Sequence, residues 1–165
     1  MRKKSSNKSL IIAAIVCVIA LIVMGVALFT GGNGESVQEF TPPPFEETAE
    51  TGVPEVPAEL GYGEIDAKVY KASICGGLIL KDDKVDIYLT NPEENDVWMK
   101  VRVLDTEGNR LGETGLIKPG QYVKSVTFIE HVKAGTNVQL KIMAYEPETY
   151  HSAGAVTMNT VVGGN

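Results

Sequence analysis

Few residues of this chain have the types and spacing needed for catalysis. Cys75 could act as a nucleophile, but the stretch ASICGG around it lacks the motif of a known thiol enzyme. His131 and His151 are too far apart in the sequence to form a metal-binding pair by local spacing. The motifs GxSxG, HExxH, CxxC and GxGxxG do not occur. We therefore expect a protein without catalytic activity or cofactor, in which Cys75 is a buried, inert thiol or pairs with another molecule.

Carboxylates gather in two stretches, residues 82–86 and 93–96, which flank one expected strand. Oxygen ligands of this kind suit Ca²⁺. The strand between the two stretches would separate them by roughly 20–30 Å, because an extended chain advances about 3.3 Å per residue. One shared metal site is therefore excluded. Because acidic residues are also common in turns, we predict no metal site here.

Strand parity indicates the best candidate for a contact surface. We expect a strand at 97–103 to pair with one at 138–144, as strands C and F do in immunoglobulin-like domains, so that their outward side chains share a face. Aromatic residues and Arg are enriched in binding hot spots. The face could contact an anionic cell-wall polymer, a glycan or a protein, or its residues could be ordinary cross-strand pairs. The predicted face consists of Trp98, Lys100, Arg102, Lys141, Met143 and Tyr145.

The elements that would position this face follow a strand pattern. After Ile65, short apolar alternations are separated by turn residues every eight to twelve positions, and no helical period appears. This pattern predicts an all-β fold, an immunoglobulin-like antiparallel β-sandwich of about seven strands over residues 65–165. The expected strands lie near 66–72, 78–80, 85–90, 97–103, 121–130, 138–145 and 155–162.

Residues 30–64 read as a linker. They hold eight Glu, five of the eight prolines and neither Lys nor Arg, and their apolar residues follow no period. Such a segment buries too little surface to offset its ordering entropy. We therefore predict a disordered acidic, Pro-rich tether that holds the following domain away from the membrane.

Residues 10–29 form an uncharged apolar run, LIIAAIVCVIALIVMGVALF. Twenty helical residues span roughly 30 Å, the thickness of a bilayer's hydrocarbon core. Four cations lie in residues 1–9, so the positive-inside rule predicts a cytoplasmic N-terminal tail and an extracellular domain at 65–165. The lipid bilayer would then be the first partner, through residues 10–29. Cleavage of this segment as a signal peptide, which would release a secreted form, is the alternative.

The net charge of −6 is the sum of +4 over residues 1–30, −8 over 31–64 and −2 over 65–165. No large basic field exists, so a nucleic-acid partner is not expected. No feature of the sequence indicates an oligomeric state.

Four phrases of the domain support a resemblance to a group of known proteins: DIYLTNPEENDVWMKVRVLDTEG, GLIKPGQYVKSVTF, VKAGTNVQLKIMAYEPET and AVTMNTVV. It resembles uncharacterised, single-pass, envelope-exposed β-sandwich proteins of Gram-positive anaerobes. The resemblance implies a small antiparallel sandwich on an N-terminal anchor and transfers no active site.

Three functional hypotheses follow from the sequence. The first is a membrane-anchored, cell-surface binding or accessory module without catalytic activity. The second is an inhibitor of an extracytoplasmic enzyme such as a protease, which would insert the loop 91–96 or the tract 147–154 into a cleft. The third is a thiol-dependent envelope hydrolase that uses Cys75.

Overall fold

The computed structural model describes residues 40–164, in which Pro42 begins one compact unit that continues to the C-terminal end. The predicted all-β class is confirmed, because this unit contains ten strands and a single short 3-10 helix among its described residues. The predicted tail 1–9, membrane span 10–29 and first linker residues 30–39 lie outside the described residues. Within the described part, no helix is long and apolar enough to cross a bilayer.

The strands alternate with short turns along the chain. They are β1 (Glu50–Thr51), β2 (Tyr62–Asp66), β3 (Lys71–Cys75), β4 (Leu78–Lys81), β5 (Lys84–Asn91), β6 (Trp98–Leu104), β7 (Arg110–Glu113), β8 (Gln121–Thr127), β9 (Asn137–Tyr145) and β10 (Ser152–Gly163), with the 3-10 helix η1 at Ala58–Leu60.

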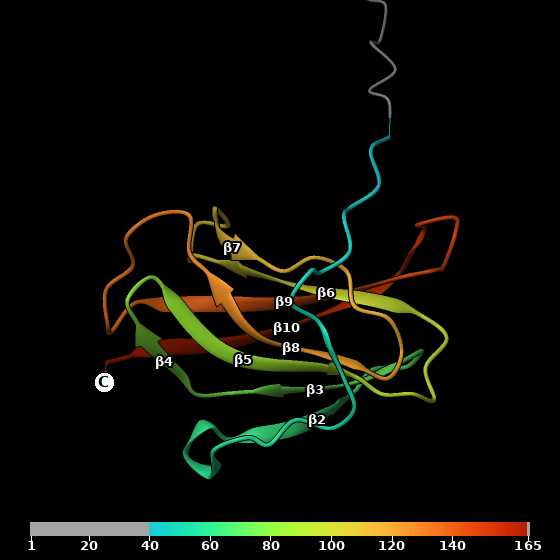
Figure 1. Cartoon of the computed structure of the whole chain (residues 1–165). Coiled ribbons are helices and arrows are strands. Elements are labelled where there is room, and N and C mark those ends of the chain that lie inside the picture. The colour runs from blue at the N-terminus through green and yellow to red at the C-terminus, as the bar shows by residue number, and fades with distance from the viewer. Residues whose placement is uncertain (1–39, 165) are drawn as a thin grey trace, which may run out of the picture. The chain divides into compact units, whose positions relative to one another are not determined.

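Two antiparallel groups of strands form the two layers visible in Figure 1. One group runs β7-β6-β9-β10, and the other runs β1-β8-β5-β4 with the hairpin β2-β3 attached to β5. A parallel ladder between β10 and β4 joins the groups, where Val162 and Gly163 pair with Leu78 and Ile79. The domain is therefore one curled, mixed sheet of ten strands that resembles a half-barrel.

This topology corrects the predicted sandwich of about seven antiparallel strands. The strand count is too low because the short β1 and β7 lack a long apolar alternation, and because the single strand expected near 66–72 is two strands, β2 and β3, that form a hairpin. The parallel pair was missed because β10 and β4 meet only through their ends, over two residues each. Local periodicity predicts strands but not which distant edges close the sheet.

The core lies between the two layers and is built by regular alternation. In β9, every second side chain is buried, and its neighbours of the other parity are half-exposed. β6 adds a buried row beside β9 in the same layer, and β5 contributes a row from the other layer. The buried residues of these three strands include Val85, Ile87, Leu89, Met99, Val101, Val103, Val138, Leu140, Ile142 and Ala144.

A β-bulge in β5 creates a second, smaller cluster outside this core. The register with β8 shifts between Asp86 and Leu89, and Tyr88 within the shift has a left-handed φ of 46°. An extra residue of this kind re-aims a side chain. Tyr88 packs against Leu60 and Cys75 instead of joining the main core.

The segment from Pro42 onward corrects the predicted disordered linker. Phe45 forms a parallel bridge with Leu116, β1 pairs with β8, and η1 places the buried Leu60 over Cys75. The folded unit therefore begins at Pro42 rather than at Ile65. The apolar residues of the segment follow no helical or strand period, because the segment only adds edge pairs and a covering layer to a sheet formed by later residues. Contacts with these later residues offset the entropy lost when the segment is ordered.

Candidate functional site: the outer face of β6 and β9

The expected pairing of β6 with β9 is confirmed. The two strands are antiparallel neighbours, and the six residues of the predicted face lie directly opposite one another. Five of them are half-exposed, whereas Lys100 is buried at 4% exposure. The cross-strand pairs are Trp98 with Tyr145, Lys100 with Met143, and Arg102 with Lys141.

Glu113 of β7 forms ion pairs with two of the three cations of this face. Its carboxylate lies 3.1 Å from Lys100 Nζ and 2.8 Å from Arg102 Nη2, and Arg110 Nη1 lies 2.8 Å from its other oxygen. Burial raises the pKa of Glu113, but the hydrogen bonds and charges of Arg102 and Lys100 outweigh this effect, so the pKa is lowered. The face is therefore less cationic than the sequence alone predicts.

Lys141 is the cation of the six that keeps its charge available. Its side chain is half-exposed, and within residues 40–164 no carboxylate lies at ion-pair distance from it. The β10 residue opposite it is the exposed Thr157. One ammonium group therefore stands at the edge of a surface whose other two cations are already paired.

An aromatic cluster extends the face beyond the predicted residues. The ring of Trp98 makes edge contacts with Phe45 and Tyr150, at centroid distances of 4.8 and 5.3 Å. Lys118 Nζ lies 4.8 Å from the centre of the Phe45 ring. Sequence reasoning missed Phe45 because it lies in the apparent linker. It missed the role of Tyr150 because this residue reaches Trp98 from a tight turn, with a left-handed φ of 57°.

Backbone pairing and a carboxylate fix the position of Phe45. The amide of Glu46 donates to the carbonyl of Leu116 at 2.9 Å, and the Glu46 carboxylate accepts from the Gly115 amide at 2.7 Å and from the Thr48 hydroxyl at 2.7 Å. Burial raises the pKa of Glu46, but these hydrogen bonds outweigh it and lower the pKa. The aromatic cluster is thus held by a segment that follows the predicted anchor in sequence.

Cys75 has the environment of a structural thiol. It is fully buried, as expected for the inert alternative, and packs against Leu60 and Tyr88. Burial and then the charge of Asp86 raise its pKa to about 11. A nucleophilic cysteine needs the opposite environment, since the thiolate is the reactive form.

Each of the two histidines is exposed and lies near a single carboxylate. His131 Nδ1 lies 4.0 Å from Asp83, and His151 Nδ1 lies 3.8 Å from Glu146. No group of three or more His, Cys, Asp or Glu residues in the described chain is placed to hold a metal ion. The stretch 93–96 instead borders an open groove.

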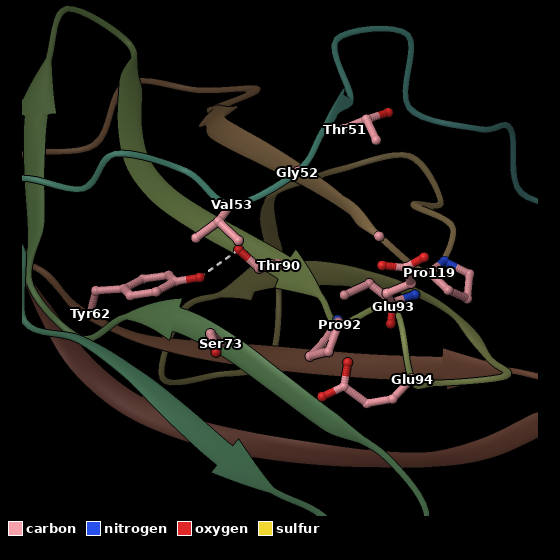
Figure 2. Close-up of a pocket in the computed structure, with 12 residues that line it drawn as sticks. Thr51, Gly52, Val53, Tyr62, Ser73, Thr90, Pro92, Glu93, Glu94 and Pro119 are labelled. Atoms are coloured by element: carbon pink, nitrogen blue, oxygen red, sulfur yellow. Dashed lines mark hydrogen bonds between the residues drawn. The ribbon is translucent and has the colours of Figure 1, made fainter.

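This groove has a volume of about 550 Å³ and lies where β5 ends. It is bounded by the N-terminal segment 51–53, by the β2-β3 hairpin and by the loop that follows β5. Figure 2 shows Tyr62 on one side of the groove and Glu93 and Glu94 on the other. No pattern in the sequence predicts this groove, because its walls come from five separate parts of the chain. Its lining residues are Thr51, Gly52, Val53, Tyr62, Ser73, Thr90, Asn91, Pro92, Glu93, Glu94, Pro119 and Gly120.

Comparison with protein-family models and with curated proteins finds no match to this chain.

Proposed function

We propose that this chain is a membrane-anchored binding or accessory module without catalytic activity, displayed outside the cell. Residues 10–29 would provide the anchor, and the cations of residues 1–9 favour an orientation with the folded unit outside. The ligand would be a component of the cell envelope, a polymer or a protein. The raised pKa and burial of Cys75 support a role that uses no thiol chemistry.

The observation that carries this proposal is the register of β6 and β9. It aligns Trp98 with Tyr145 and Arg102 with Lys141 on one outer face, and Phe45 and Tyr150 enlarge the aromatic part. A half-exposed aromatic patch on a rigid sheet beside one unpaired ammonium group can bind with little loss of side-chain entropy. The ligand would therefore present an apolar or ring surface next to a negative charge.

A capture experiment tests the proposal. The full-length chain in a neutral detergent is immobilised and incubated with envelope extract, and the retained material is compared with that of two variants. Lys141→Glu reverses the charge on the face, whereas Lys133→Glu makes the same change at an exposed position outside it. We expect Lys141→Glu to lose most of the retained ligand and Lys133→Glu to keep it.

A second variant tests the aromatic part. Tyr145→Ser removes the half-exposed ring opposite Trp98 and should also reduce retention, with thermal melting used to verify that the fold persists. Equal retention by the original chain, Lys141→Glu and a folded Tyr145→Ser would refute the assignment of this face.

A further inference from the structure

The early start of the folded unit places it close to the predicted membrane span in sequence. The span would end at Phe29 and the unit begins at Pro42, so the twelve residues 30–41 connect the two. In any conformation, twelve residues reach at most about 40 Å. A folded unit of this length has a diameter of about 35 Å. The unit therefore stays within about one diameter of the bilayer that holds the anchor.

An aromatic cluster lies close to the point where the chain enters the unit. Phe45 follows Pro42 by three residues, and its ring contacts Trp98, which in turn contacts Tyr150. Trp98 begins β6, and Tyr150 lies in the turn between β9 and β10. In Figure 1, the segment from Pro42 passes beside β6 before it reaches β2. The part of the unit nearest to the anchor along the chain is therefore aromatic.

This cluster has the composition of a membrane interface. Trp98 and Tyr150 are half-exposed, and Phe45 is 38% exposed. Trp and Tyr are enriched at the headgroup level of bilayers, because each has an apolar ring and a polar tip. The exposed Lys118 has its Nζ 4.8 Å from the centre of the Phe45 ring. A lysine stem that lies over an apolar ring leaves the ammonium group free to reach a lipid phosphate.

Carboxylates near the cluster decide which lipid it suits. Glu146 and Glu148 lie in the same turn as Tyr150 and are exposed. The Glu146 carboxylate accepts from the Thr149 hydroxyl at 3.1 Å and lies 3.8 Å from His151 Nδ1. The turn therefore adds negative charge beside the cluster, and attraction to an anionic surface does not favour docking. The rings have to provide the affinity, and a zwitterionic bilayer is sufficient as the partner.

We propose that the Trp98 cluster, which consists of Phe45, Trp98, Tyr150 and Lys118, docks on the headgroup layer of the bilayer in which the chain is anchored. The inference rests on the proposed function, because it needs the anchor at residues 10–29. Attachment to the same bilayer raises the effective concentration of lipid at the cluster. A contact too weak to hold a soluble protein on a membrane is therefore enough here.

Docking in this way leaves the rest of the candidate face accessible. Lys141 precedes Tyr145, the partner of Trp98, by four residues on β9. At about 3.3 Å per residue, Lys141 lies roughly 13 Å farther along the strand. The lipid surface and an envelope ligand would therefore contact different parts of the same layer.

Quenching of Trp98 fluorescence by brominated lipid tests the inference. The full-length chain is reconstituted into phosphatidylcholine vesicles, either plain or brominated near the headgroup end of the acyl chains, and flotation verifies insertion. Trp98 is the only tryptophan of the chain, so its emission reports on this cluster alone. We expect brominated lipid to remove roughly half of the emission, because bromine quenches only rings that lie at the level of the interface.

Two variants with matched controls locate the contact. Tyr150→Ser removes a ring of the cluster, whereas Tyr122→Ser removes a half-exposed ring of β8 in the other layer. Lys118→Glu reverses a charge at the cluster, whereas Lys84→Glu makes the same change at an exposed position of β5. For each chain, the ratio of emission in brominated and plain vesicles cancels changes in the surroundings of Trp98. We expect the two cluster variants to lose about half of the quenching or more and the two controls to keep it.

Unquenched Trp98 in a chain that floats with brominated vesicles would overturn the inference and leave the proposed function standing. Equal quenching in the original chain and in both cluster variants would also overturn it. A chain that does not float with vesicles would refute the anchor, on which the proposed function and this inference both depend. Envelope capture by the face at Lys141 is measured in detergent, without a bilayer, so its outcome is decided separately.

Discussion

Strands β5 and β9 both contribute an alternating apolar row to the core, but only β5 is also covered on its outer side. In β5, the outward Tyr88 and Thr90 are 6% and 8% exposed because the segment that contains η1 and β2 packs over them. In β9, the outward Lys141 and Met143 stay half-exposed. A strand pattern therefore identifies the core face, whereas the fate of the opposite face depends on segments distant in sequence.

The two outer faces also differ in chemistry. The covered face of β5 ends at a groove bordered by the carboxylates of Glu93 and Glu94, and the open face of β9 presents an aromatic cluster with one unpaired cation. The same N-terminal segment contributes to both, through residues 51–53 at the groove and Phe45 at the aromatic cluster. Residues that read as a spacer thus complete both candidate sites.

The largest expected effect separates the two faces of β9. Ile142→Ala leaves a cavity in the main core, where this side chain is fully buried, and should lower the free energy of unfolding by about 2–5 kcal/mol. Lys141→Ala, the next residue on the same strand, should change it by less than about 0.5 kcal/mol. Urea denaturation of both variants measures the difference, and similar losses would contradict the assigned faces.

A smaller effect is expected in the cluster over β5. Leu60→Ala should cost about 2 kcal/mol, because Leu60 packs on Cys75 and Tyr88 near the edge of the fold. If this loss of stability is confined to the cluster over β5, the cluster should open more often, and Cys75 should react with a thiol reagent roughly 10- to 30-fold faster than in the original chain. The measurement needs a Cys17→Ala background, since the chain has two cysteines.

Val53→Ala is the matched control for this variant, because it truncates an exposed apolar residue of the same N-terminal segment. It should leave the labelling rate of Cys75 unchanged. Rapid labelling of Cys75 in the folded original chain would show instead that the cover over β5 is not closed.

The ion cluster on the β6 side of the open face gives a dependence on pH. Because the folded-state pKa of Glu113 is lower than its ordinary value of 4.5, the unfolded chain takes up this proton first as the pH falls. The contribution of Glu113 is thus complete above pH 4.5 and is lost as the pH falls through its folded-state pKa. Glu113→Gln should lower the free energy of unfolding by about 1–2 kcal/mol at neutral pH. It should also make stability fall less steeply as the pH is lowered.

Glu107→Gln serves as the control for Glu113→Gln, since Glu107 is exposed and outside the ion cluster. Its stability should follow that of the original chain over the whole pH range in urea denaturation. If the stability of Glu113→Gln and that of the control fell equally steeply with decreasing pH, Glu113 would not be the cause of the acid dependence.

The outer face of β9 could be predicted because it needs only local information. The alternation of residues 138–144 defines two faces, and pairing with β6 brings Trp98 opposite Tyr145. The neutralising Glu113 could not be predicted, since β7 has only four residues and its register is set by a bulge beside Leu104. The sequence therefore predicts which side chains share this face but not its net charge.

The groove and the cover over β5 could not be predicted from periodicity. Asn91 and Asn95 read as ordinary loop residues, although their amides fix the loop that bears the groove carboxylates. Leu60 and Phe45 lie among prolines and glutamates, whose composition is typical of disorder. The composition of a segment indicates how little surface it can bury by itself. It does not indicate how much surface the segment can bury against the rest of the domain.

The smallest expected change in global stability tests whether Phe45 belongs to the open face. A Cβ atom on Gly115 would lie 2.5 Å from the backbone nitrogen of Glu46, so Gly115→Ala must displace the segment that carries Phe45. The substitution should lower the free energy of global unfolding by at most about 1 kcal/mol, because the main core is untouched. Trp98 is the only tryptophan of the chain and contacts Phe45, so its fluorescence reports the displacement directly. Gly63→Ala, where a Cβ has open space, should leave the emission unchanged. An unchanged Trp98 spectrum in Gly115→Ala would mean that the segment shifts without displacing Phe45. The position of Trp98 would then depend on β6 and Tyr150 and not on the segment that carries Phe45.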